Sequence, residues 1–215
     1  MATSVSTDVR ASDGRVPGLR GLATRSRLLE CTERLLADRS YRDLRVIDVA
    51  RAAGTSPATF YQYFPGVEAA VLVLAEQMAD DRERLIRIVR DTNWSGRRAY
   101  AGAQALAAEF VRFWHDHDSV LRVVDLASAE GDPRFRAVRT RLLSEVTVAL
   151  AEVATEWRGT RHRGADPDPR AVGAVLVSML SHVAAHQRGL EASDIRVADA
   201  QIVMAELIHR AVAGR

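Results

Sequence analysis

The chain has 215 residues, 47% of them hydrophobic and 27% charged, a composition typical of a folded globular protein that excludes an intrinsically disordered one. All 30 Lys and Arg positions hold arginine, and the formal net charge is only +2. Bulk charge is therefore excluded as a means of binding DNA, which would need a local motif. The single cysteine permits no intramolecular disulfide, and no apolar run approaches the roughly 20 residues of a membrane span. We expect a soluble, cytoplasmic protein without membrane contact.

Residues 1–21 contain Gly, Ser, Pro and spaced Arg without periodicity, and predict a flexible arm. The arginines of this arm leave two interpretations open, a disordered terminus or an arm that enters a DNA groove. Thr24 is predicted to cap the first helix. Apolar residues then recur at helical spacing, at Leu28, Leu29, Cys31, Leu35 and Leu36.

Two short helical segments follow, joined by a tight turn. The first carries Val46 and Val49 and is closed by Gly54, whereas Ser56-Pro57 is a start signal for the second. The second segment is too short to be stable alone, so the first must hold it in place. This arrangement predicts a helix-turn-helix, in which the second helix presents its N-terminal residues to the major groove of DNA.

The side chains of the second short helix suit DNA contact. Phe60 and Phe64 are expected to face inward, which leaves polar residues on the other faces. Hydroxyl groups suit phosphate oxygens, and Gln62 can make two hydrogen bonds to adenine. For the arginines nearby, a solvated helix face remains the alternative. The predicted DNA-binding residues are Arg25, Arg27, Arg45, Thr55, Ser56, Ala58, Thr59, Tyr61, Gln62 and Tyr63.

Helical periodicity continues to the C-terminus, and no stretch predicts a strand pair, so the fold class is all-α. We predict one long helix over residues 67–91 and a hinge at 93–98. The next helix is expected to carry one apolar face, formed by Ala103, Leu106, Ala107, Phe110, Phe113 and Trp114. A shorter segment at 120–127 and a long helix at about 133–157 are expected next, then a surface loop at 158–169. Two last helices are predicted over 169–188 and 195–212.

Residues 22–75 resemble the TetR family of transcriptional regulators. The family signature reads Asp-Ile-Ala, Ala-Gly-Val-Ser, Thr-Leu-Tyr, His-Phe and Ser-Lys-Glu. The corresponding residues here are Asp48-Val49-Ala50, Ala53-Gly54-Thr55-Ser56, Thr59-Phe60-Tyr61, Tyr63-Phe64 and Gly66-Val67-Glu68. Three positions depart from the family: Val67 replaces a phosphate-binding lysine, Arg45 replaces a Ser or Thr cap, and Tyr63 replaces a histidine. The first departure puts one DNA backbone contact in doubt, and Arg45 could restore it together with Arg25 and Arg27.

The resemblance implies a three-part organisation. Residues 1–21 form the arm, 22–66 the helix-turn-helix DNA-binding domain, and 67–215 a helical ligand-binding and dimerisation domain in which 67–92 is the connecting helix. A homodimer would bind a palindromic operator in double-stranded DNA. The last two helices would form the dimer interface, although packing wholly within one chain is the alternative. The predicted interface residues are Val172, Val175, Leu176, Leu180, Val183, Ile202, Ala205, Ile208 and Val212.

A small apolar effector is expected to bind in the middle of the C-terminal domain. The predicted ligand-binding residues are Phe110, Phe113, Trp114, Leu126, Leu142, Met179 and His182, for each of which a place in the ordinary core is the alternative. His182 and His186 have a spacing that can chelate a metal, but no Cys or nearby carboxylate completes the set. We therefore predict no metal site, no cofactor and no catalytic residues.

The predicted function is a ligand-responsive transcriptional regulator, a repressor that its effector releases from the operator. The alternative is an all-helical protein that binds a small molecule or lipid and has lost its DNA-binding role. A regulator that acts as an activator, or without a ligand, is a third interpretation. Cys31 stands where the family prefers alanine and is expected to be a packed thiol.

Overall fold

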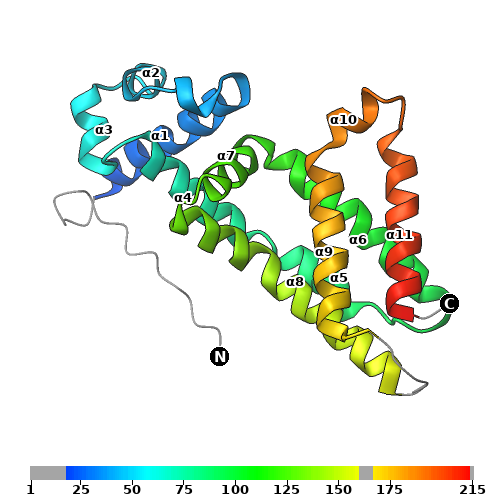
Figure 1. Cartoon of the computed structure of the whole chain (residues 1–215). Coiled ribbons are helices and arrows are strands. Elements are labelled where there is room, and N and C mark those ends of the chain that lie inside the picture. The colour runs from blue at the N-terminus through cyan, green and yellow to red at the C-terminus, as the bar shows by residue number, and fades with distance from the viewer. Residues whose placement is uncertain (1–17, 160–166, 214–215) are drawn as a thin grey trace. The chain divides into compact units, whose positions relative to one another are not determined.

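The computed structural model describes residues 18–159 and 167–213, and within these ranges the chain is all-α, as predicted (Figure 1). The N-terminal half contains α1 (Leu19–Asp38), the 3-10 helix η1 (Tyr41–Asp43), α2 (Val46–Ala52), α3 (Pro57–Tyr63), α4 (Val67–Asp80) and α5 (Glu83–Asp91). The C-terminal half contains α6 (Gly96–Asp116), α7 (Asp118–Ala129), α8 (Pro133–Gly159), α9 (Pro169–Ala185), α10 (Gln187–Glu191) and α11 (Val197–Ala213). None of the described helices is both long enough and apolar enough to cross a membrane.

The chain divides into two compact units. The head unit comprises the residues up to 77 together with 119–135, and the body unit comprises 78–118 and 136–215. This grouping differs from a linear division at residue 66, because α7 and the start of α8 belong to the head unit. Three of the described helices contribute residues to both units: α4, α8 and, by its first residue Asp118 alone, α7.

The first helix begins earlier than the sequence pattern predicted. It starts at Leu19 with Gly18 as its N-cap, so the predicted arm ends at least four residues sooner, and residues 1–17 lie outside the described ranges. Thr24 is not a cap. It lies within the helix, where its hydroxyl donates to the Arg20 carbonyl at 3.0 Å. A Thr hydroxyl can bond to a carbonyl four residues back inside a helix, so the residue type alone did not mark the boundary.

The predicted long helix over residues 67–91 is two helices in the structure, α4 and α5. The break lies at Asp81 and Arg82, where the Asp81 amide donates to the Met78 carbonyl at 3.0 Å. Arg82 turns its guanidinium back onto the Ala79 carbonyl, Nη1 to O at 2.5 Å, and also pairs with Glu145. The last carbonyls of a helix lack partners within it. Arg82 lies just beyond α4 and supplies such a partner, so it stabilises the C-terminal end of α4. Hydrophobic periodicity did not reveal this helix end.

The remaining boundaries shift less. The predicted hinge at 93–98 is shorter, because α6 already begins at Gly96 and the Asn93 side chain accepts from the Ser95 amide at 3.0 Å. The predicted helix over 169–188 ends at Ala185 and is followed by α10. The predicted surface loop falls mostly on residues 160–166, outside the described ranges.

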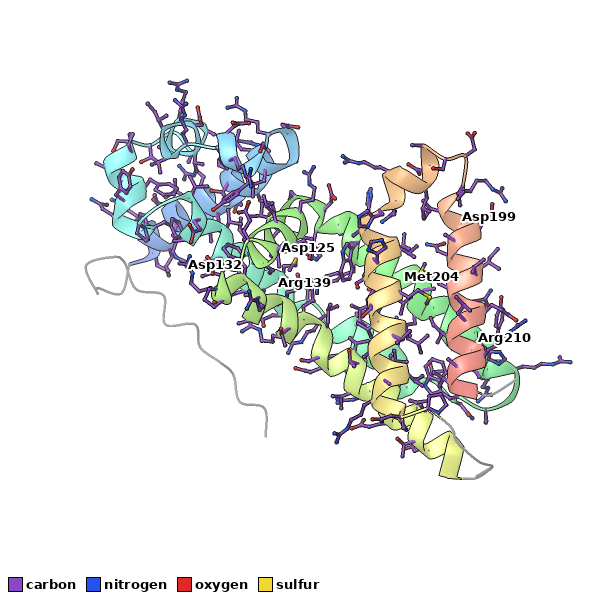
Figure 2. The ribbon with its side chains drawn as sticks, in the orientation of Figure 1. Asp125, Asp132, Arg139, Asp199, Met204 and Arg210 are labelled. Carbon is purple, nitrogen blue, oxygen red and sulfur yellow. The ribbon has the colours of Figure 1, made fainter. Side chains whose placement is uncertain are left out.

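The body unit is built around α6, which packs against α5, α9 and α11. Phe110 on α6 and Ile208 on α11 are fully buried. Met204 on α11, labelled in Figure 2, is almost fully buried. Glu109 is also buried, and its carboxylate receives hydrogen bonds from Arg112 and an ion pair from Arg84 at 3.0 Å. The hydrogen bonds that Arg112 donates to Glu109 raise the pKa of the Arg112 guanidinium. Because a buried carboxylate is costly unless it is paired, these two arginines compensate the charge of Glu109.

A close helix contact in the body unit yields a paired prediction. A Cβ added at Gly173 on α9 would lie 2.5 Å from the Thr147 backbone oxygen of α8, whereas one at Gly189 on α10 would meet nothing within 4 Å. Gly173→Ala is expected to lower the free energy of unfolding by about 1–3 kcal/mol, because backbone cannot yield as a flexible side chain does. Gly189→Ala should instead raise the free energy of unfolding by roughly 0.5–1 kcal/mol, because alanine has a higher helix propensity than glycine. Denaturant unfolding monitored by circular dichroism measures both, and equal effects would contradict the close contact.

Candidate nucleic-acid interface

The turn between α2 and α3 has a defined hydrogen-bond pattern. Gly54 has a φ of +66°, and its amide donates to the Arg51 carbonyl at 3.1 Å. The Thr55 amide donates to the Ala50 carbonyl at 2.9 Å. These two bonds and the left-handed glycine constitute a Schellman motif, which satisfies the last carbonyls of α2 and reverses the chain. The turn thereby fixes the direction in which α3 begins.

The start of α3 is capped as the sequence predicted. Ser56 is the N-cap residue, and its hydroxyl accepts from the Thr59 amide at 3.2 Å. Pro57 occupies the first helical position, where no amide donor is required. At the start of α2, by contrast, Arg45 makes no side-chain cap hydrogen bond, as expected from the loss of a Ser or Thr there.

The Ser56 cap carries a stability prediction. Ser56→Ala is expected to lower the free energy of unfolding by about 1 kcal/mol, because one amide at the start of α3 loses its acceptor. Ser56→Asp should retain the cap and most of the stability, since aspartate is an equally good N-cap residue. Urea unfolding of the three proteins is the measurement. An alanine variant as stable as the aspartate variant would show that the cap contributes nothing.

Two phenylalanines hold α3 against the rest of the head unit. Phe60 is fully buried and Phe64 nearly so, and their ring centroids lie 5.5 Å apart. The guanidinium of Arg25 on α1 lies over the Phe64 ring, 5.2 Å from its centroid. Burial lowers the pKa of this guanidinium. Arg25 therefore packs on Phe64 and connects α1 to the residue that follows α3.

Seven of the ten predicted DNA-binding residues lie on α3 and the turn before it, whereas Arg25 and Arg27 lie on α1 and Arg45 precedes α2. Ser56, Ala58, Tyr61 and Gln62 are exposed, and Thr55, Thr59 and Tyr63 are partly buried. Tyr61 keeps 52% of its surface accessible although it touches the buried Phe60 edge-on. Arg27 and Arg45 are exposed, whereas Arg25 is partly buried. An exposed polar helix on a buried aromatic base is a suitable surface for reading a groove.

Sequence reasoning missed the contacts within the head unit between residues 36–68 and residues 122–134. Arg42 pairs with Glu130, Arg134 pairs with Glu68, and Arg122 donates to the Leu36 carbonyl at 3.1 Å. Partners 60 to 90 residues apart leave no local pattern, so no signal in the sequence identified them. Burial raises the pKa of the neighbouring Tyr41 hydroxyl. The positive charge of Arg134 lowers this pKa, and the negative charges of Asp132 and Glu130 raise it further. Asp132 is labelled in Figure 2.

Comparison with known proteins supports the same interpretation over most of the chain. Residues 28–72 match the model of bacterial regulatory proteins of the tetR family, and residues 85–215 match the tetracyclin repressor-like C-terminal domain. The second match alone covers more than half of the 215 residues. The chain belongs to the TetR family. The TetR family consists of helix-turn-helix transcriptional regulators rather than enzymes.

Relatives of this TetR-family chain include the HTH-type transcriptional regulator EthR of Mycobacterium tuberculosis, 28% identical over 65% of this chain and 62% of EthR. The match thus spans less than two thirds of that relative. EthR of Mycolicibacterium smegmatis is 29% identical over 73% of this chain and 82% of its own length. A tetR-family regulator of Streptomyces coelicolor has a similar fold, with a TM-score of 0.69 and 18% identity over 92% of this chain and 84% of that one.

Effectors of the TetR family include acyl-CoA, as the structure of Thermus thermophilus FadR in complex with lauroyl-CoA shows. That fold matches with a TM-score of 0.57 and 20% identity over 87% of this chain and 94% of FadR. At this identity the likeness concerns the fold alone.

The predicted effector residues of this TetR-family chain do not all lie together. Leu126 is in the head unit, where it lines a half-open hollow of about 430 Å³ with Leu36, Tyr41 and Arg122. The other six are in the body unit. Leu142 is buried, Met179 is partly buried, and His182 is exposed, with its ring stacked on that of His186 at 4.1 Å between centroids.

The aromatic residues of the predicted effector site form one buried cluster on α6. Phe110 and Trp114 stack with ring centroids 5.5 Å apart and planes 17° from parallel, and Phe113 lies 5.7 Å from Trp114. The three side chains are between 0% and 6% exposed. Among the described residues Trp114 Nε1 has no hydrogen-bond partner. The cluster therefore combines an apolar surface with one unused donor.

The residues of the predicted dimer surface differ in their burial within one chain. Five of the nine are buried: Leu176, Leu180, Ala205, Ile208 and Val212. Val175 and Ile202 are 67% and 55% exposed, and Val172 and Val183 are partly buried. Further exposed apolar residues are Val148 on α8 and Val203 and Leu207 on α11. Sequence periodicity identified the helices, but it did not separate the inward face from the outward one.

Proposed function

We propose that this TetR-family chain is a homodimeric repressor that a small apolar effector releases from a palindromic operator. The observation that supports DNA reading is the exposed side of α3, from its N-cap Ser56 to Gln62 near its end, held by the Schellman turn and the buried Phe60. A helix of seven residues is presented rigidly only because these contacts fix both its start and its base.

Dimerisation would double the DNA surface that the protein reads. One recognition helix covers too few base pairs for tight specific binding, so dimers read two half-sites one helical turn apart. We define the outer apolar face as Val148, Val175, Ile202, Val203 and Leu207, all at least 46% exposed. Exposed apolar residues gathered on three consecutive long helices are typical of an interface. This face supports pairing of two copies through α8, α9 and α11.

The outer apolar face can be tested by charge insertion. Ile202→Asp is expected to convert the dimer to a monomer, because an aspartate at a buried interface would lack a partner. Light scattering after size exclusion measures the mass. Leu22→Asp on α1, an exposed leucine of the head unit, is the matched control and should leave the mass unchanged. A dimeric Ile202→Asp variant would contradict the proposed interface.

Release by the effector would act through the helices common to both units. The proposal is that effector binding in the body unit shifts α4, so the two recognition helices of a dimer no longer match adjacent major grooves. Such a shift requires only that the effector bind one head spacing more tightly than the other by a few kcal/mol. The residues of α4 on either side of Gln77 belong to different units, so this helix connects them.

The decisive experiment is DNA binding by the purified full-length protein. A fluorescent duplex from the region upstream of its own coding sequence, and duplexes from neighbouring promoters, are titrated in fluorescence anisotropy at several salt concentrations. We expect one of them to bind at least 1,000-fold more tightly than random DNA, as specific sites do. Affinity should fall steeply with salt, because phosphate contacts release counterions. Equal affinity for every duplex would contradict specific regulation by this protein.

A further inference from the structure

Two buried tryptophans of the body unit differ in one respect. Trp94 is 9% exposed, and its Nε1 donates to the Val89 carbonyl at 2.7 Å. Trp114 is 6% exposed, yet its Nε1 has no acceptor among the described residues. Indole nitrogen is a donor only, and a buried donor without a partner destabilises the folded state. The indole donor of Trp94 is therefore hydrogen-bonded, whereas that of Trp114 has no acceptor among the described residues.

Packing alone does not account for tryptophan at position 114. The residues that contact its rings, Phe110 and Phe113, are both phenylalanine. A phenylalanine at 114 would also bring an aromatic ring and would leave no donor unpaired. The charged groups one turn away on α6 are already engaged, because Glu109 receives both Arg84 and Arg112. No carboxylate of this ion cluster is therefore left to accept from the indole.

We propose that Trp114 Nε1 donates a hydrogen bond to the effector, and that the effector is accordingly a neutral, mainly apolar molecule with a carbonyl oxygen. The inference rests on the proposed function, in which the aromatic cluster lines the effector site. A pure hydrocarbon would leave the donor unpaired. A carboxylate would enter apolar surroundings in which Arg84 and Arg112 are already paired with Glu109 and Asp116, so its desolvation would be uncompensated. A ketone, ester or amide oxygen meets both conditions.

The state of the donor is tested first, without any effector. Trp94→Phe and Trp114→Phe assign the two indole signals in a ¹H–¹⁵N correlation spectrum. We expect the Trp94 proton to resonate downfield, as a hydrogen-bonded indole does, and the Trp114 proton upfield of it. Trp94→Phe should lower the melting temperature, whereas Trp114→Phe should leave it unchanged or raise it. A Trp114 proton as far downfield as that of Trp94 would show that an acceptor is already present, and would overturn the proposal.

Release from the operator then tests the ligand class. The probes are matched pairs that differ by one carbonyl group: acetophenone with ethylbenzene, benzylacetone with n-butylbenzene, and methyl hexyl ketone with octane. In the anisotropy assay we expect at least one ketone to release the wild-type protein and move the Trp114 signal downfield, while its hydrocarbon partner does neither. Trp114→Phe should keep its operator affinity but need at least tenfold more of that ketone.

The possible failures are distinguishable. If no duplex is bound specifically, the proposed function fails, and the spectrum of the free protein still reports on the Trp114 donor. If the operator is bound but no ketone releases it, or ketone and hydrocarbon act equally, the inference about the effector is wrong. The inference is equally wrong if Trp114→Phe responds to the ketone as the wild-type protein does.

Discussion

Phe60→Ala is expected to unfold the recognition helix locally and to abolish operator binding. The Phe60 side chain is fully buried, and it contacts Tyr61 and Phe64 at ring-centroid distances of 6.1 and 5.5 Å. Removing a buried phenylalanine ring costs about 3–5 kcal/mol. Because α3 has only seven residues, it has no other source of stability of that size. Hydrogen exchange read by mass spectrometry should show loss of protection in α2 and α3, with α9 and α11 unchanged.

The control for this experiment keeps the volume while it removes the aromatic ring. Phe60→Leu should lose much less protection in α3 than Phe60→Ala, because a leucine still fills most of the site. Full protection of α3 in the alanine variant would show that the Schellman turn and the Ser56 cap are sufficient by themselves. The local stability would then have to be assigned to Gly54 and Ser56 rather than to the aromatic pair.

Gln62→Ala is expected to weaken operator binding by about 1–3 kcal/mol, close to tenfold or a hundredfold in Kd, if Gln62 reads an adenine in the groove. The residue is exposed on α3, so its loss should leave the thermal stability almost unchanged. Binding to random DNA should also be unaffected, because a base contact contributes only at the specific sequence. Anisotropy titrations with operator and random duplexes give both affinities.

Arg45→Ala is the matched contrast to this base-reading prediction. Its side chain is exposed at the start of α2 and makes no cap hydrogen bond, so it is available to a phosphate. A lost phosphate contact weakens binding to every duplex alike and reduces the salt dependence by about one charge. If Gln62→Ala behaved as Arg45→Ala is expected to, Gln62 would contact the backbone and carry no sequence information.

Several features were predicted from the sequence because the signals for them are local. The Ser56-Pro57 start, the Gly54 corner and the Phe60–Phe64 spacing depend on a few neighbouring residues, and each is confirmed by the geometry of the turn and of α3. Local signals gave wrong helix boundaries where one residue type can act in two ways. Thr24 has the side chain of a cap but bonds within α1, and Arg82 terminates α4 by a contact that hydrophobic periodicity does not register.

The sequence by itself determined the fold class, the helix-turn-helix and the family, because helical periodicity and turn chemistry depend on residues that are close together in the chain. Only the tertiary structure decided which faces of α9 and α11 are core and which remain outside, since Leu176 and Val175 are neighbours of equal apolarity. It alone placed most of α7 in the head unit, where Arg122 of α7 donates to the Leu36 carbonyl of α1. It also decided that Trp94 has an acceptor and Trp114 has none. These differences depend on residues distant in the chain, and no local pattern encodes them.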